Sequence, residues 1–312
     1  MNNICVVGSI NMDYVIMLDE IPKMGETLQA HNFIKVPGGK GANQAIAARR
    51  LGGSVSMIGC VGNDENGRVL LDNLKKEGIN IQCVKTDECS PTGLAFIMVD
   101  KSGSNIIAVY PGANDSLSPE DVKLNKEIIA SSDILVAQFE TPLKATFEAF
   151  KIAHENNIIT ILNPAPAKDI PDELFQYCDI VIPNESEAEK ITGISPINTQ
   201  NIKKIGAYFE NKGVRFTIIT LGDKGAALVG NEKVAVMDAL KVNAVDSTAA
   251  GDSFIGGIAW YLSNNKELNF DNLSRAIKFA NKVAAITVTR EGAQSSIPFL
   301  KEVIEIFGGE EL

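Results

Sequence analysis

Histidine is scarce in this sequence, since His31 and His154 are the only two among 312 residues. A histidine-rich metal site is therefore excluded, and we expect any proton abstraction to fall to a carboxylate, because the commonest general base is nearly absent. The five cysteines are odd in number and include no Cys-x-x-Cys pair, which argues against a disulfide framework and a zinc ribbon. No basic segment precedes the first apolar run, so no signal peptide is expected. These absences predict a protein of the reducing cytoplasm.

Long apolar runs and an excess of positive charge are lacking as well. No uninterrupted apolar stretch reaches the ~18 residues that a membrane helix needs, and 39 acidic against 29 basic residues give a formal charge of −10. Broad electrostatic attraction to nucleic acid or to an anionic membrane is disfavoured. Neither is expected as a partner, and a phosphorylated ligand would have to be bound locally.

Short β-branched runs alternate with amphipathic segments along most of the chain. The predicted strands are residues 4–7, 55–60, 134–138, 158–162, 180–182 and 216–221, and the predicted helices include 41–51, 67–77, 143–155 and 199–212. This alternation predicts an α/β fold with a doubly wound, mainly parallel sheet flanked by helices. Active sites of such sheets lie at the carboxyl ends of the strands.

Two regions, at about 13–36 and 92–110, break the alternation, because they read as strand pairs with no helix between them. We interpret them as a small β-sheet lid inserted into one domain that spans residues 1–312, since no linker or change of composition marks a second domain. A lid of this kind often exposes an apolar face. We therefore expect a homodimer formed through paired lids.

The most distinctive motif is VDSTAAGDSFIGG at residues 245–257, where small residues precede an apolar helical run. Small side chains leave the N–H groups of Ala249, Ala250 and Gly251 open to an anion at the helix start, where the dipole favours negative charge. Asp252 follows in the first turn, where its carboxylate can accept the proton of a substrate hydroxyl. A tightly packed helix whose first-turn Asp merely complements the dipole explains the same spacing equally well.

A second constellation lies near the N-terminus, in GSINMD at 8–13 and PGGKGANQA at 37–45. Glycines before a helix permit close approach of a ligand to the backbone, and Asn and Asp offer the donors and acceptors that a polyol requires. The run is neither a P-loop nor a G-x-G-x-x-G fingerprint, so a dinucleotide-dependent oxidoreductase is disfavoured. Taken alone, such a segment is more often a structural loop.

Together these motifs resemble the ribokinase-like family of carbohydrate kinases, whose G-A-G-D-type signature is present here in the T-A-A-G-D form at 248–252. The resemblance covers essentially the whole chain. It implies ATP-dependent phosphorylation of D-ribose at the 5-hydroxyl, with Asp252 as the catalytic base and the amides of Ala249, Ala250 and Gly251 as the anion hole. It also implies that the sugar is held by Asn11, Asp13, Gly39, Lys40, Asn43, Glu140 and Asp252.

The same resemblance assigns residues to the nucleotide and to Mg²⁺. In Asn184-x-x-Glu187, an amide and a carboxylate at the start of a predicted helix suit the handling of Mg²⁺-bound water, although a capped acidic helix start is the simpler local reading. The resemblance places Thr220, Gly222, Gly225, Gly251 and Asn281 at ATP. A tight turn and close helix packing are the alternatives for the glycines and for Asn281.

A potassium site is expected beside the anion hole. Asp246 stands six residues before Asp252, and an unpaired carboxylate there would oppose the potential that a phosphoryl group needs. The resemblance implies that K⁺ lies among Asp246, Thr248, Thr287, Arg290, Gly292 and Ser296, largely through backbone oxygens. The alternatives are that Asp246 caps the following helix or pairs with Arg290.

Two other functions stay open at this point. One is a kinase for another small sugar or a nucleoside, such as 2-deoxyribose or fructose, because single contacts can switch specificity. The other is a non-catalytic sugar or nucleotide sensor on the same fold. Sugar-dependent turnover of ATP separates the sensor from both kinases.

Overall fold

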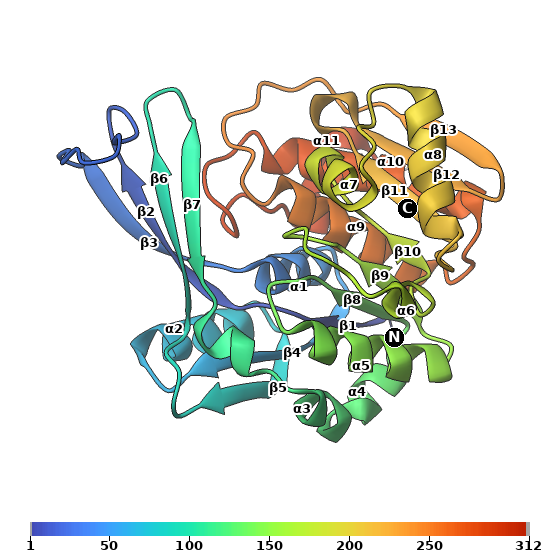
Figure 1. The fold of residues 1–312 in the computed structure, drawn as a ribbon, viewed down its shortest axis with the longest axis horizontal. Helices are drawn as coiled ribbons and strands as arrows, with labels where there is room; N and C mark the ends of the chain where they lie inside the picture. Colours follow the sequence, from blue (N-terminus) through green and yellow to red (C-terminus); the bar gives the residue numbers. More distant parts are fainter. Residues whose placement is uncertain (1, 310–312) are drawn as a thin grey trace.

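The computed structural model describes residues 2–309 and contains two β-sheets of unequal size (Figure 1). The large sheet has nine strands in the order β13-β12-β11-β10-β9-β8-β1-β4-β5. All neighbours are parallel except β11 with β12 and β12 with β13, which are antiparallel. The strands are β1 (Asn3–Val7), β4 (Ser54–Gly62), β5 (Asn80–Asp87), β8 (Ile134–Ala137), β9 (Ile159–Leu162), β10 (Ile180–Val181), β11 (Phe216–Thr220), β12 (Ala226–Gly230) and β13 (Lys233–Met237).

Helices cover both faces of this sheet. One core lies under α1 (Lys40–Arg50), α2 (Glu65–Lys76), α9 (Ala250–Asn264), α10 (Phe270–Thr287) and α11 (Leu300–Phe307). The other lies under α3 (Pro119–Leu124), α4 (Lys126–Ala130), α5 (Leu143–Glu155), α6 (Asp172–Phe175), α7 (Glu185–Thr192) and α8 (Thr199–Glu210). Strand β1 shows the division, because Ile4 and Val6 belong to the first core whereas Cys5 and Val7 belong to the second. Burial on both faces explains the continuous apolar runs of the strands.

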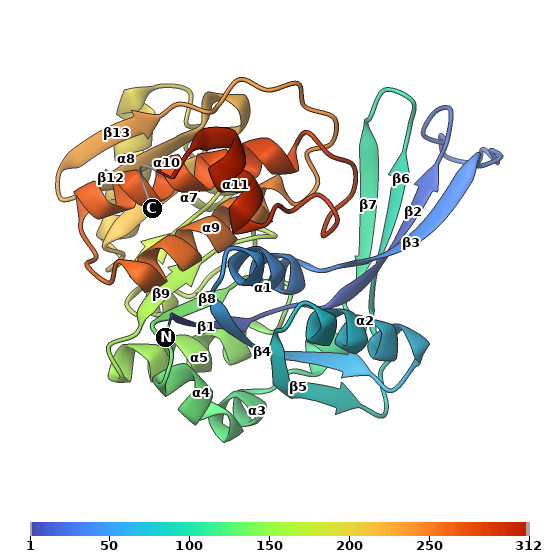
Figure 2. The same cartoon turned by 180° about the vertical axis from the view of Figure 1, so that it is seen from behind.

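The small sheet has the strand order β3-β2-β6-β7 and projects from one side of the core, with its base beside α2 (Figures 1 and 2). Its strands are β2 (Asn11–Met17), β3 (Asn32–Gly38), β6 (Gly93–Val99) and β7 (Asn105–Tyr110). The predicted doubly wound α/β fold with a separate small sheet is thus confirmed. The strands of the small sheet extend beyond the predicted limits of about 13–36, since β2 begins at Asn11 and β3 ends at Gly38. Both strands therefore enter the region of the candidate site.

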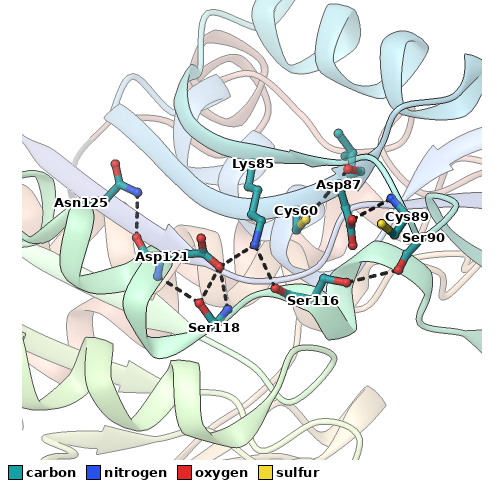
Figure 3. Close-up of polar contacts among 10 residues, drawn as sticks. Cys60, Lys85, Asp87, Cys89, Ser90, Ser116, Ser118, Asp121 and Asn125 are labelled. Atoms are coloured by element: carbon teal, nitrogen blue, oxygen red, sulfur yellow. Dashed lines mark hydrogen bonds and ion pairs between the residues drawn. The ribbon is translucent and has the colours of Figure 1, made fainter.

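Polar contacts tie the base of the small sheet to the core (Figure 3). The Lys85 ammonium group on β5 contacts the Asp121 carboxylate of α3 (3.0 Å) and donates to the Ser116 carbonyl (3.4 Å). Ser116 ends the short 3-10 helix η1 (Gly112–Ser116), which follows β7, and its hydroxyl lies 3.3 Å from that of Ser90, in the segment before β6. Both connections to β6 and β7 are therefore fixed at one point.

Several element limits and strands differ from the prediction. Helix α2 begins at Glu65 rather than 67, because the Asp64 carboxylate caps it by accepting from the Gly67 N–H (2.7 Å). Strands β5, β12 and β13 were not predicted, and the 3-10 helix η2 (Gly222–Lys224) occupies the turn between β11 and β12. Within residues 2–309, no helix combines the length and apolar character needed to cross a membrane.

Candidate active site

Helix α9 places Asp252 at the edge of a cavity of about 210 Å³. The N-cap residue Ala249 has φ 60°, in the left-handed region, and no side chain caps the helix. Gly251 lines the cavity beside Asp252. The Ala250 N–H donates to the Ser247 carbonyl (3.2 Å), so this one of the three expected anion-hole amides is already engaged in a turn. The helix start therefore presents backbone donors and a carboxylate to the same space.

The Asp252 carboxylate is buried, and each of its oxygens accepts a hydrogen bond. Asn43 Nδ2 donates to Oδ2 and Gln44 Nε2 donates to Oδ1, both at 2.9 Å. Burial raises the pKa of Asp252, against the opposing effects of the Lys40 charge and of these two amides. The geometry keeps the carboxylate in one orientation, facing the cavity at the start of α9.

Polar residues from the base of the small sheet lie on one side of Asp252. Asp13 on β2 is 8% exposed, and its Oδ1 has no hydrogen-bond partner among the described residues. Burial, Glu140 and Asp252 raise the pKa of Asp13 to about 7, against the lowering effect of Lys40. A buried acceptor without a partner is rare in folded proteins, and this one fits a ligand hydroxyl.

The glycine turn before α1 brings Lys40 to the same place. Gly39 has φ 91°, and a Cβ there would lie 2.7 Å from the Asn11 backbone nitrogen, so the turn requires glycine. Burial alone would lower the pKa of Lys40, but the surrounding carboxylates of Asp252, Glu140, Glu187 and Asp13 together raise it. Lys40 is thus a charged lysine on the wall of the cavity.

Four residues in this region were not predicted as site residues. The Ser9 hydroxyl donates to Glu140 Oε2 (2.6 Å), which also accepts from the Lys40 N–H (3.2 Å). Asn114 Nδ2 donates to Asn11 Oδ1 (2.7 Å). The other two are Gln44, which contacts Asp252, and Asn163, which lines the cavity. Asn163 directly follows a predicted strand and Ser9 lies two residues after one, so their positions carried a usable signal.

Asn184 and Glu187 form a reciprocal capping box at the start of α7. The Asn184 Oδ1 accepts from the Glu187 N–H (2.8 Å), and Glu187 Oε2 accepts from the Asn184 N–H (2.9 Å). The simpler interpretation, that this motif is a capped acidic helix start, therefore describes the observed hydrogen bonds correctly. Both residues also line the cavity with Thr220. Burial raises the pKa of Glu187 against the effects of the Asn184 N–H and of Lys40.

The other nucleotide candidates lie elsewhere. Gly222 and Gly225 have φ 58° and 91° and form the turn between β11 and β12, outside the residues that line the cavity. Asn281 on α10 is 8% exposed, and its Nδ2 donates to the carbonyls of Met237 (3.2 Å) and Asp238 (3.1 Å). Its side chain thus holds the backbone that follows β13.

The two segments expected to enclose K⁺ meet in space. Asp246 Oδ2 accepts from the Gly292 N–H (2.9 Å), and Oδ1 accepts from the N–H (2.8 Å) and hydroxyl (2.6 Å) of Thr248. Arg290 pairs with Glu302 (2.7 Å) instead of with Asp246. The alternative pairing of Asp246 with Arg290 is thereby wrong, and the turn that Asp246 makes with Thr248 precedes α9.

Thr287 and Ser296 have fully buried hydroxyl groups with partners inside the protein. Thr287 Oγ1 lies 3.0 Å from both Ser253 Oγ and the Val283 carbonyl oxygen, which share its one hydroxyl hydrogen. Ser296 Oγ donates to the Ala293 carbonyl (2.7 Å). These bonds use the hydroxyl hydrogens of the two residues and fix their side chains inside the protein.

Comparison with known proteins matches residues 1–300 to the pfkB family carbohydrate kinase model. The chain is 43% identical over 300 residues to ribokinase from Haemophilus influenzae, with 96% of each chain covered. It is 40% identical over 313 residues to the bifunctional ribokinase/ribose-5-phosphate isomerase A of Fructilactobacillus sanfranciscensis, of which it spans 57% of the length. The structure of Arabidopsis thaliana ribokinase complexed with ribose and ATP superimposes with a TM-score of 0.89 at 30% identity, covering 97% of both chains.

Proposed function

The chain belongs to the pfkB family of carbohydrate kinases, and we propose that it transfers the γ-phosphoryl group of ATP to the 5-hydroxyl of D-ribose. The products are ribose 5-phosphate and ADP. The observation that carries this proposal is the position of Asp252, whose buried carboxylate interacts with that of Asp13 and lines the same cavity as Gly251 at the open helix start. Asp13 Oδ1 is free for a sugar hydroxyl. A base placed between a polyol site and an anion site suits phosphoryl transfer to a hydroxyl.

The sugar occupies the space at the base of the small sheet. Asp13 accepts from one sugar hydroxyl through its free Oδ1, and Lys40, Asn11 and Glu140 bind others. Gly39 keeps the backbone close to the sugar, and Asn43 positions Asp252 as well as contacting the substrate. The 5-hydroxyl points at Asp252, which accepts its proton as the oxygen attacks phosphorus.

ATP enters the cavity from the side of α7 and β11. The amides of Ala249, Ala250 and Gly251 and the Lys40 charge stabilise the γ-phosphoryl as it moves. Of these amides, Ala250 must first exchange its bond with Ser247. Thr220 contacts the phosphates, because it lines the cavity. Gly222 and Gly225, in the β11–β12 turn, and Asn281, beside the segment after β13, lie outside the cavity lining and border the base and ribose of the nucleotide.

Asn184 and Glu187 would hold the water shell of a Mg²⁺ ion bound with ATP, and the ion would supply neutralisation of the phosphate charge. Among residues 2–309, no three His, Cys, Asp or Glu side chains cluster as metal ligands. Glu187 and Asn184 fit contacts to metal-bound water rather than a protein cage, because both line the cavity while capping α7.

K⁺ binds beside the anion hole, between the segment of Asp246 and Thr248 and the segment of Arg290 and Gly292. The meeting of the two segments at the Asp246–Gly292 contact supports this site. Thr287 and Ser296 contribute backbone oxygens, as the family resemblance implies. A cation held there would neutralise Asp246 and so preserve the positive potential at the start of α9.

The described part of the chain, residues 2–309, forms one domain in which the small sheet acts as a lid over the sugar and as the interface of a homodimer. Cross-strand register places Phe33, Phe96, Ile106 and Tyr110 on the face opposite Asp13, and each is more than two-fifths exposed. An exposed apolar patch of this kind fits a second copy of the chain. The five free thiols, all within residues 2–309, support a reducing cytoplasmic location.

The test is ADP release measured with ribose, 2-deoxyribose, fructose and a nucleoside. We expect the highest kcat/KM with ribose. A higher value with another acceptor would assign the enzyme to that acceptor instead. Sugar binding without any sugar-dependent ADP release would refute the kinase and favour the sensor.

A further inference from the structure

Two chains of side-chain amides end on the Asp252 carboxylate. On one side, Gln138 Nε2 donates to Gln44 Oε1 (2.6 Å), and Gln44 Nε2 donates to Asp252 Oδ1 (2.9 Å). On the other side, Gln294 Nε2 donates to Asn43 Oδ1 (3.1 Å), and Asn43 Nδ2 donates to Asp252 Oδ2 (2.9 Å). Gln44 and Asn43 each accept from the outer amide and donate to Asp252, and all four amides are buried.

The direction of the Gln138–Gln44 chain leaves one buried atom unsatisfied. Gln138 Oε1 has no hydrogen-bond partner among residues 2–309, and it lies where a Cβ at Gly8 would clash with it. If the side-chain amides of Gln138 and Gln44 were both rotated by 180°, Gln138 Nε2 would take the position of the unsatisfied Oε1. Gln44 Oε1 would then face an Asp252 oxygen. Two acceptors repel when the carboxylate is ionised, whereas a protonated carboxyl group could donate to the reversed amide. The observed direction therefore matches an ionised Asp252.

The other groups around Asp252 mostly favour its protonated form. Burial raises its pKa, and the Glu140 carboxylate acts in the same direction. Asp13 and Glu187 also face it, since the Asp252 charge raises the pKa of each. Lys40 is the cation that opposes them. One lysine faces several carboxylates, so directed hydrogen bonds matter for the ionised state.

We propose that Gln44, oriented by Gln138, is a positioning residue that keeps Asp252 ionised and correctly turned to accept the proton of the substrate hydroxyl. This inference rests on the proposed role of Asp252 as the base. Gln44 and Gln138 lie outside the sugar and nucleotide contacts. Their removal should change the proton transfer and leave substrate binding nearly intact.

The first test is the pH profile of kcat/KM for ribose in Gln44→Met and Gln138→Met, which keep the side-chain length and remove the amide. Loss of one hydrogen bond to a carboxylate corresponds to roughly one pH unit. We expect Gln44→Met to move the acid limb upward by about that much, so that kcat falls roughly tenfold at a pH on the limb and little above it, with KM little changed. Gln138→Met should move the limb in the same direction by less, because Gln44 is then free to turn.

The matched control is Thr146→Val. Thr146 is buried, and its hydroxyl donates weakly to the Gln138 carbonyl (3.4 Å), but it has no place in the amide chain. Its pH profile should equal that of the wild type. A wild-type acid limb in Gln44→Met, with activity reduced only in proportion to the folded fraction, would overturn the proposal, and so would a shift in Thr146→Val as large as in Gln44→Met.

A second readout needs no turnover. Because burial raises the folded-state pKa of Asp252, the wild type should lose stability relative to Asp252→Asn as the pH rises through that pKa. In the Gln44→Met background this decline should extend about one pH unit higher. Urea unfolding measures the free energy of unfolding of four proteins: the wild type, Asp252→Asn, Gln44→Met and the double variant. Gln138→Met replaces Gln44→Met if the latter does not fold. If stability declined over the same pH range with and without Gln44→Met, the positioning role of Gln44 would be overturned. If the wild type released no ADP in response to sugar, only the proposed function would be overturned.

Discussion

The raised pKa of Asp13 predicts that sugar binding varies with pH in the neutral range. Burial, Glu140 and Asp252 raise this pKa to about 7, and the ionised carboxylate is the form that accepts strongly from a sugar hydroxyl. At about pH 6 only roughly a tenth of the protein carries the ionised form. Since apparent affinity falls with the competent fraction, ribose should bind roughly tenfold more weakly at about pH 6 than at about pH 8.

Isothermal titration of ribose without ATP, at three pH values from about 6 to 8, measures this dependence. Asp13→Asn keeps the shape of the side chain and removes its titration, so its affinity should be nearly independent of pH. At the upper pH it should bind more weakly by about 1.5–3 kcal/mol, the contribution of a hydrogen bond to a charged group. Equal wild-type affinity across the range, or a variant with the wild-type slope, would refute the reasoning.

Four further outcomes follow from the structure. Asp252→Asn should lower turnover by roughly 10²–10⁴-fold with ribose affinity retained, and near-normal turnover in a steady-state assay would contradict the base. Asp13→Asn should raise the free energy of unfolding by a few kcal/mol at about pH 8, because a carboxyl group whose pKa is raised from 3.8 to about 7 loses stability as the pH rises; in urea titrations the gain should vanish toward pH 4, and a gain independent of pH would count against it. Initial rates should be higher in KCl than in NaCl or CsCl at fixed ionic strength, and Asp246→Ala should abolish the difference, whereas general screening treats the three salts alike. Ile106→Asp should convert a dimer to a monomer in sedimentation measurements, and an unchanged mass would exclude the small sheet as the interface.

The local parts of the site could be predicted from the sequence. Asp252 stands in the first turn of a helix preceded by small residues. The turn before Lys40 is recognisable from the consecutive glycines Gly38 and Gly39. Such signals depend on neighbours within a few positions, as helix starts and turns do. The α5 limits, 143–155, were predicted for the same reason.

The contacts between distant segments could not be predicted in this way. Gln44 and Asp252 are 208 positions apart, and only the packing of α1 against α9 brings them together. Gln44 reads in the sequence as one polar residue on an apolar helix. Its role depends on where Gln138 lies, at the end of β8, and no local pattern contains that information.

The missed strands have a related cause. Strand β5, NIQCVKTD, lies at the edge of the large sheet and mixes polar with apolar residues, so it lacks the continuous apolar run of a central parallel strand. Strands β12 and β13 form an antiparallel hairpin at the opposite edge. Strand β13 is the edge strand and is mostly exposed or half-buried, so its pattern is weak. Strand β12 is fully buried, but its sequence AALVG lacks a β-branched run.

Phosphorus–proton NMR of the reaction products tests the central claim most directly. Ribose and ATP incubated with the wild type should yield one sugar phosphate for each ADP, with phosphorus coupled to the protons of C5, and Asp252→Asn should yield almost none in the same time. ADP formed without a sugar phosphate, phosphorus coupled to a different carbon, or equal product from Asp252→Asn would contradict the account.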